Sequence, residues 1–470
     1  MMNWIALSPE LWMLATIGVF LGRSMMRPDA GRDHLLALVT SAVALGVALA
    51  GTGFSGELFA GTYRVDLFSQ FYKCLLAAGF FLVVCLCDGM QGVREDLQAE
   101  FYLLLAVCTL AMMMLVSSVH LLTLYITLEL SSYSLYILVS LRRDRARGIR
   151  AGLKYFLVGA AASAVMLFGL ALVYGTTGTA YLIDLLAALP VQTGQPAFSI
   201  GLLLLLGGFL FKLAIFPFHV WAPDVYEGAA NPVAAYIATA SKVAAVGILV
   251  RLAVLGTTAY FVHVLAVLAI ASMTIGNLAA ITQTDFKRLL AYSSVAQGGY
   301  ILIGILSMDP AGYAAATFYA FAVLVMKFTC FMVVVQVAVG DKNPTIEDLA
   351  GLHRHAPVMA MALMMALFGL GGIPPTIGFT GKLLLFTAAM AKGHFTLVLI
   401  AMLNVVISLY YYLKVLRAAY FLEPSPDAPH VQETLPMKAL SLAMIAAMVV
   451  IGFYPNHLIE LTRSAAALIS

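Results

Sequence analysis

Charged residues are scarce in this chain of 470 residues, since Asp, Glu, Lys and Arg together make up 10% of it. Hydrophobic residues make up 62%, a balance that excludes an ordinary soluble domain. The formal net charge is only +3, so a nucleic-acid-binding surface is not expected. The sequence contains no phosphate-binding loop, dinucleotide fingerprint or haem-attachment motif.

Cysteine is also sparse, and its placement argues against a metal or redox site. The cysteines all fall in apolar stretches: Cys74, Cys85, Cys87, Cys108 and Cys330. Cys85 and Cys87 are too close in sequence for the usual metal-ligand spacing, so small core residues are the better interpretation. We expect no metal and no cofactor in this chain, and any redox chemistry must belong to partner proteins.

Long apolar stretches dominate what is present. A helix needs about 20 apolar residues to cross a bilayer, so the sequence predicts an all-α polytopic membrane protein with about fourteen transmembrane helices. The first stretch lacks a basic start and a clear cleavage site, which favours a retained helix over a signal peptide. The expected spans are 4–22, 33–52, 66–88, 100–117, 119–141, 151–175, 199–220, 232–255, 260–282, 289–307, 312–338, 357–391, 395–421 and 436–454.

Lysine and arginine lie mainly in loops of one parity. The loop RRDRARGIR, between the fifth and sixth expected helices, holds five arginines, whereas loops of the other parity hold few basic residues. By the positive-inside rule the arginine-rich side is cytoplasmic. We therefore expect a multi-pass protein of the bacterial inner membrane with both termini on the periplasmic side.

Four ionisable residues lie deep inside apolar stretches: Glu129, Lys212, Lys242 and Lys382. A charge at the bilayer centre costs about 2.5–3.5 kcal/mol, so four cost on the order of 10 kcal/mol. Such residues persist when they pair, line a wet cavity or carry ions. An ion pair between Glu129 and Lys212 would offset both costs, either as a static structural pair or as a switchable one. A switchable pair would release and recapture a proton, because an isolated buried lysine loses its proton more readily than a paired one.

Three further groups are possible relay residues. Lys327 lies deep in FYAFAVLVMKFTCF and could stand opposite Lys242 or Lys382. Lys154 lies about one turn inside its helix and could instead extend to the cytoplasmic surface. His219 follows Pro217 and could titrate near neutral pH, or it could be a plain hydrogen-bonding cap.

Two of the expected helices should be broken. The span 199–220 runs into Pro217, and the span 357–391 is too long for one crossing and contains GLGGIPPTIGFTG. Each lies fourth in a set of five helices and carries a lysine, which predicts two inverted five-helix repeats. The expected divisions are a three-helix segment, the first repeat, the second repeat and a C-terminal helix, over 1–99, 100–255, 260–421 and 422–470.

Several motifs resemble one known family over nearly the whole chain. The family is the antiporter-like membrane subunits of respiratory complex I, and within it subunit N of bacterial NADH-quinone oxidoreductase. The stretches that carry the resemblance are NWIALSPELWM, LYITLELSSYSLYILVSLRR, FKLAIFPFHVWAPDVYEGAANPVAAYIATASKVAAVGILVR, QTDFKRLLAYSSVAQGGYILIG and GLGGIPPTIGFTGKLLLF.

The resemblance implies a fourteen-helix antiporter-like bundle that moves protons outward. Glu129 and Lys212 match the family's essential glutamate–lysine pair, Lys242 its central lysine and Lys382 the terminal lysine of subunit N. Lys154 matches a lysine often present on the sixth helix, whereas Lys327 departs from the expected subunit N pattern. The family's FMN, iron–sulfur clusters and quinone belong to partner subunits. The implied partners are other antiporter-like and small membrane subunits, the lipid bilayer and, indirectly, the peripheral redox arm.

Two other functions remain open at this point. The chain could be the ion-translocating subunit of a multisubunit Na⁺/H⁺ antiporter or of an energy-converting membrane hydrogenase. It could also be a scaffold that pumps nothing, although a scaffold need not bear the cost of the buried charges.

Overall fold

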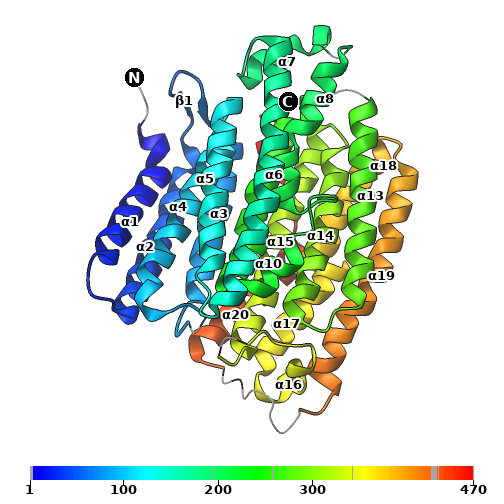
Figure 1. Cartoon of the computed structure of the whole chain (residues 1–470). Coiled ribbons are helices and arrows are strands. Elements are labelled where there is room, and N and C mark those ends of the chain that lie inside the picture. The colour runs from blue at the N-terminus through cyan, green and yellow to red at the C-terminus, as the bar shows by residue number, and fades with distance from the viewer. Residues whose placement is uncertain are drawn as a thin grey trace. The chain divides into compact units, whose positions relative to one another are not determined.

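The computed structural model describes residues 4–90, 92–192, 194–256, 259–340, 342–424, 431 and 433–468. Over these residues the chain is mostly helical and divides into two compact units. The first unit comprises Met1–Leu213, Gly228–Val264 and Ser464–Ser470, and the second comprises Ala214–Glu227 and Leu265–Arg463. Figure 1 shows the elements in chain order.

The first unit is built mainly from helices of the N-terminal half. They are η1 (Trp4–Leu7), α1 (Ser8–Ser24), α2 (Ala30–Ala50), η2 (Gly51–Gly53), α3 (Leu67–Cys85), η3 (Glu95–Leu97), α4 (Gln98–Ser117), α5 (Leu121–Ser140), α6 (Arg145–Thr177), α7 (Leu182–Gln192), α8 (Pro196–Leu205), α9 (Gly207–Leu213), α11 (Asn231–Ala238) and α12 (Ala240–Ala253). Helices α1 to α4 pack against one another (Figure 1). Helix α6 packs against α5, α8 and α9.

The second unit is built mainly from helices of the C-terminal half. They are α10 (Ala222–Gly228), α14 (Phe286–Ile305), α15 (Pro310–Val337), η4 (Glu347–Leu349), α16 (Leu352–His355), α17 (Pro357–Gly371), α18 (Ile377–Ala391), α19 (Phe395–Phe421) and α20 (Leu435–Phe453). Two helices, α13 (Ala259–Ile281) and α21 (Asn456–Ala466), include the chain positions where one unit gives way to the other.

Aspartates begin several of these helices. The side chain of Asp66 accepts a hydrogen bond from the backbone N–H of Ser69, and the Ser69 hydroxyl accepts one from the Asp66 N–H, which together form a capping box at α3. Asp29, Asp285 and Asp309 likewise cap α2, α14 and α15. These caps accept hydrogen bonds from N–H groups that have no partner within the helix. Each cap therefore stabilises the start of an apolar helix directly after a short polar loop.

The prediction of a multi-pass helical protein is confirmed. Within the described residues, 12 helices are long and apolar enough to cross a membrane. The expected span 289–307 corresponds to α14, which is not among those 12, and the span 357–391 is divided between the shorter helices α17 and α18. The helix α7 was not predicted.

Both expected helix breaks are present. The span 199–220 ends as a helix at Leu213, and the chain turns at Ala214, whose φ of 61° is unusual for a residue other than glycine. The span 357–391 breaks between α17 and α18, where Gly372 ends α17 with a φ of 78°. A third break was not predicted: at Thr239, with φ −116° and ψ −89°, α11 gives way to α12.

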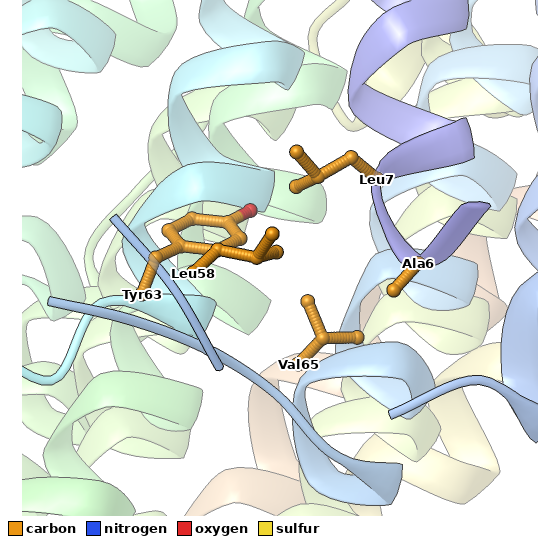
Figure 2. Packing of buried hydrophobic residues seen from close by; sticks show 5 residues of the cluster. All are labelled: Ala6, Leu7, Leu58, Tyr63 and Val65. Carbon is orange, nitrogen blue, oxygen red and sulfur yellow. The ribbon is translucent and has the colours of Figure 1, made fainter. Parts of the chain in front are cut away.

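A two-stranded hairpin, also not predicted, lies between α2 and α3. Strands β1 (Gly56–Leu58) and β2 (Tyr63–Val65) pair antiparallel with Gly56 opposite Val65. Figure 2 shows its buried side chains beside the start of α1, and the cluster consists of Ala6, Leu7, Leu58, Tyr63 and Val65. The alternation along β2 places Tyr63 and Val65 inside and Arg64 outside.

Candidate functional site

Glu129 lies on α5 and is half-buried. Its Oε1 accepts a hydrogen bond of 2.5 Å from the hydroxyl of Ser163 on α6. A carboxylate that accepts a hydroxyl hydrogen bond recovers part of the hydration it loses in an apolar environment. The contact therefore holds Glu129 on the α6 side of its helix.

Lys212 is the second-last residue of α9, and its side chain is 2% exposed. Its Nζ donates a hydrogen bond of 2.8 Å to the hydroxyl of Ser131, two residues after Glu129 on α5. Positions two apart on a helix face different directions. Within the described residues, Glu129 and Lys212 form no ion pair at or below 4.0 Å, so each expected partner is bound to a serine instead.

Lys242 lies near the start of α12 and is 3% exposed. Its Nζ donates a hydrogen bond of 2.7 Å to the carbonyl oxygen of Leu213, the last residue of α9. The last carbonyls of a helix lack partners within the helix and carry partial negative charge, so a lysine stabilises them. Lys242 thus binds the end of the same short helix that carries Lys212.

Lys382, on α18, makes the corresponding contact at the other broken helix. It is 3% exposed, and its Nζ donates a hydrogen bond of 2.6 Å to the carbonyl oxygen of Leu370, one residue before the end of α17. Its Nζ also lies 4.7 Å from the centre of the Tyr300 ring, a cation–π contact. At each predicted break, therefore, a carbonyl at the end of the preceding helix, α9 or α17, accepts a hydrogen bond from a buried lysine.

Lys327, on α15, is fully buried in the second unit. Its Nζ donates hydrogen bonds of 2.8 Å to the carbonyl oxygen of Leu290 and to the hydroxyl of Ser293, both on α14. The Ser293 hydroxyl in turn lies 2.5 Å from the hydroxyl of Tyr412 on α19. The lysine is thus the first member of a polar chain rather than an isolated charge.

The chain continues from Tyr412 through Gln297. The Gln297 Nε2 donates to the Tyr412 hydroxyl at 3.2 Å and to the Leu370 carbonyl oxygen at 3.3 Å, and the Tyr319 hydroxyl donates to Gln297 Oε1 at 2.5 Å. Leu370 is the residue that Lys382 also binds. Hydrogen bonds therefore connect Lys327 to Lys382 through buried groups of one unit.

The sequence did not identify the side chains that link these lysines. Gln297 is a polar residue inside an apolar stretch, which is the signal that could have marked it. Tyr412 lies in a run of three tyrosines, a pattern that favours helix packing, and it is buried, but its hydroxyl belongs to the network.

The two remaining candidates lie in less buried places. Lys154 is half-buried on α6, and His219 is half-buried between α9 and α10, with its ring 5.8 Å from that of Phe216. The His219 Nδ1 is buried and has no hydrogen-bond partner within the part of the chain that the structure describes. No group of three or more His, Cys, Asp or Glu side chains among those residues could hold a metal ion.

Comparison with known proteins gives the family. A family model for the membrane domain of NADH:quinone oxidoreductase and Mrp antiporter subunits matches residues 118–408. NADH-quinone oxidoreductase subunit N 2 of Syntrophobacter fumaroxidans is 60% identical over 469 residues, 99% of each chain. This chain belongs to the subunit N family of NADH-quinone oxidoreductase.

Solved structures agree with membership of the subunit N family. A chain of respiratory complex I from Thermus thermophilus is 32% identical, with a TM-score of 0.85 over 96% of this chain and 98% of that one. A chain of the Mrp complex from Dietzia sp. has a TM-score of 0.88 over 99% and 97% of the two chains, but at 21% identity it shows only that the fold is shared. The segment 118–408 that the family model matches contains all five interior charged residues: Glu129, Lys212, Lys242, Lys327 and Lys382.

Proposed function

We propose that this subunit N translocates protons outward across the bacterial inner membrane, driven by electron transfer in partner subunits of NADH-quinone oxidoreductase. FMN, iron–sulfur clusters and quinone would be bound by those partners, and this chain would hold no redox centre. The observation that carries the proposal is the hydrogen-bonded chain from Lys327 to Lys382 in a buried interior.

The input half of the pathway would use Glu129 and Lys212. Both groups are ionisable, and each is bound to a serine hydroxyl instead of to the other. A hydroxyl partner is weaker than an opposite charge, so a small movement of α5 or α9 would exchange one arrangement for the other. Closing the pair would hold the proton on Lys212, and opening it would favour its release toward Lys242.

The output half would use Lys327 and Lys382. Hydroxyl groups donate and accept, so Ser293 and Tyr412 can each pass a proton onward. The Gln297 amide donates to both Tyr412 and the Leu370 carbonyl, and that carbonyl only accepts, so these two groups position Tyr412 and Lys382, and a water molecule would carry the proton between them. Lys154 and His219 would serve at most as entry groups. Both are more exposed than the four buried lysines of the pathway, which are Lys212, Lys242, Lys327 and Lys382.

We also propose a repeat organisation, an orientation and a set of neighbours for this chain. The first repeat would cover 100–255 and the second, inverted repeat 260–421, with both termini on the periplasmic side. Neighbouring antiporter-like and small membrane subunits would cover apolar side chains left exposed on α5, α6 and α19, among them Ile126, Leu153 and Leu403.

The first experiment is purification of the assembly in mild detergent through a tag on this chain, followed by mass spectrometry. Flavin and iron–sulfur subunits are expected. Recovery of small antiporter subunits alone, or of a nickel–iron hydrogenase module, would contradict the complex I assignment and favour the Na⁺/H⁺ antiporter or hydrogenase function.

The second experiment tests the pathway in the same assembly reconstituted in liposomes. The variants Lys212→Met, Lys242→Met, Lys327→Met and Lys382→Met keep an unbranched side chain one atom shorter but remove the ionisable group. Proton transfer by a positioned side chain contributes about 100-fold or more, so coupled pumping should fall by about that factor. The control is Lys342→Met, since Lys342 is exposed. Unchanged pumping in all four variants would leave the scaffold function.

A further inference from the structure

A buried ion pair lies near the start of the chain, before the segment 118–408 that the family model matches. The Nζ of Lys73 on α3 is 2.6 Å from the Oε1 of Glu10 on α1. The hydroxyl of Tyr63 on β2 donates a hydrogen bond of 2.5 Å to the same oxygen. The Lys73 Nζ also lies 5.4 Å from the centre of the Tyr63 ring.

The three side chains are almost completely removed from solvent. Glu10 is 5% exposed, Tyr63 3% and Lys73 0%. Burial, and next the charge of Glu10, raise the pKa of Tyr63 well above its usual value, so this residue remains a hydroxyl donor. A buried carboxylate and ammonium are costly even when paired, because both lose their hydration. The contacts among the three side chains leave the second carboxylate oxygen of Glu10, Oε2, without a hydrogen-bond partner within the described residues.

Several polar atoms around the pair are buried without partners. Within the described residues, this holds for Oε2 of Glu10, Oγ of Ser117 and both polar atoms of Gln70. Gln70 and Ser117 are each 0% exposed. Gln70 lies one turn before Lys73 on α3, and Ser117 precedes Ser118, whose backbone pairs with Tyr63. These atoms belong to α1, α3 and α4, and Gln70 lies three residues before Lys73, on the same face of α3.

Buried polar atoms without partners destabilise a fold, so a native cluster of them indicates bound water. Internal water occupies sites that offer two to four polar partners, as this cluster does. We propose that Glu10, Lys73 and Tyr63 form a hydrated proton-binding site at the start of α1 and α3. The ligand is a proton supplied by water, and the site does not rest on the proposed function of the interior lysines.

Residues of the β1–β2 hairpin also line two clefts of about 500 and 480 Å³. Arg64 lines both clefts, Arg251 the first and Asp66 the second. One terminal nitrogen of Arg251 donates to both carboxylate oxygens of Asp66, at 3.0 and 3.1 Å. The clefts also hold the carboxylates of Glu57 and, in the first, Asp184, and Glu10 differs from these in being buried beside Lys73 and Tyr63.

The step balances without any other reactant. Glu10 takes one proton from a water molecule that has been protonated from the cleft, and the ion pair becomes a neutral carboxyl beside the Lys73 ammonium. The net positive charge that results stays on the Lys73 ammonium, whose Nζ lies 5.4 Å from the centre of the Tyr63 ring. Return of the proton to water restores the carboxylate and the pair.

The test is infrared difference spectroscopy of the whole purified assembly between neutral and acidic pH. The carboxyl band of Glu10 should be present in the wild type, lost in Glu10→Gln and retained in Glu57→Gln, which removes an exposed carboxylate of the same hairpin. In Lys73→Met the band should already be present at neutral pH, because the carboxylate has lost its cation. The Tyr63→Phe variant keeps the pair and should shift the frequency of the band.

Identical spectra for Glu10→Gln and Glu57→Gln would overturn the proposal. If Glu10→Gln does not assemble, an unshifted carboxyl spectrum in Tyr63→Phe would overturn it equally. The infrared measurement requires neither NADH oxidation nor pumping. A negative result in the pumping assay would therefore leave the proton-binding site at Glu10 standing, and a negative infrared result would not contradict the proposed role of the buried lysines Lys212, Lys242, Lys327 and Lys382.

Discussion

The hydroxyl of Tyr412 lies 2.5 Å from the hydroxyl of Ser293 and accepts a hydrogen bond from Gln297. It is therefore the group through which Lys327 is connected to the end of α17. Replacing it by phenylalanine removes one oxygen and leaves the packing of the ring.

Tyr412→Phe is expected to lower coupled proton pumping by about 100-fold without loss of assembly, because it interrupts the chain at one atom. Pumping by the reconstituted complex is the measurement. The matched control is Tyr410→Phe on the same helix, since Tyr410 is 63% exposed. Equal pumping in the two variants would show that the network is structural.

The serines that bind Glu129 and Lys212 can be removed together. In a Ser131→Ala, Ser163→Ala double variant each charged group loses a hydrogen bond worth about 1.5–3 kcal/mol. The two groups are expected to recover it from each other, so a structure of the variant complex should show them within 4 Å. Ser134→Ala is the control, because Ser134 donates within its own helix to Leu130. Separation of the charges in the double variant would contradict a switchable pair.

The buried pair of Asp66 and Arg251 should stabilise the first unit. Burial raises the pKa of Asp66, but the charge of Arg251 and the hydrogen bonds from Ser69 outweigh it and leave the pKa lowered. A lowered pKa means that the stabilisation is complete above the ordinary carboxyl pKa and is lost as the pH falls below it.

Asp66→Asn is therefore expected to destabilise the unit by about 3–5 kcal/mol near pH 7, and the difference from wild type should shrink in acid. Thermal unfolding of the purified complex at several pH values is the measurement. Glu57→Gln, at the exposed pair with Arg64, should cost under about 1 kcal/mol at any of them. A pH-independent effect of Asp66→Asn would show that its ionisation is irrelevant.

The crossing of α6 and α8 depends on Gly169. A Cβ atom at this position would lie 2.3 Å from the backbone nitrogen of Leu205 and 2.7 Å from the carbonyl oxygen of Gly201, and backbone atoms cannot move aside. Gly169→Ala is expected to destabilise by about 1–3 kcal/mol. Gly175→Ala, on the same helix with nothing within 4 Å, should have no such effect in the same thermal assay.

The sequence allowed most helices and two breaks to be predicted, for direct physical reasons. An apolar stretch of bilayer length has few alternatives to a helix, and Pro374 and Pro375 cannot continue one. The break at Thr239 was not predictable in this way, since neither proline nor glycine adjoins it. The hairpin of β1 and β2 was missed because its strands have only three residues each.

The site was predictable as a set of residues but not as a set of contacts. A lysine in an apolar stretch is visible in the sequence because of its cost. Its partner is not visible, because Lys327 and Ser293 lie 34 positions apart, and Ser293 and Tyr412 lie 119 positions apart. Lys212 had a carboxylate as its expected partner, and the packing of α9 against α5 supplied Ser131 instead.

The oxygens that hold Lys242 and Lys382 belong to the backbone of Leu213 and Leu370. No substitution at either position deletes them, since every amino acid carries the same carbonyl. Alanine scanning would therefore report both leucines as ordinary apolar residues, and related chains could replace them freely while keeping the acceptor. Two contacts of the pathway are in this sense encoded by where a helix stops and by no side chain at all.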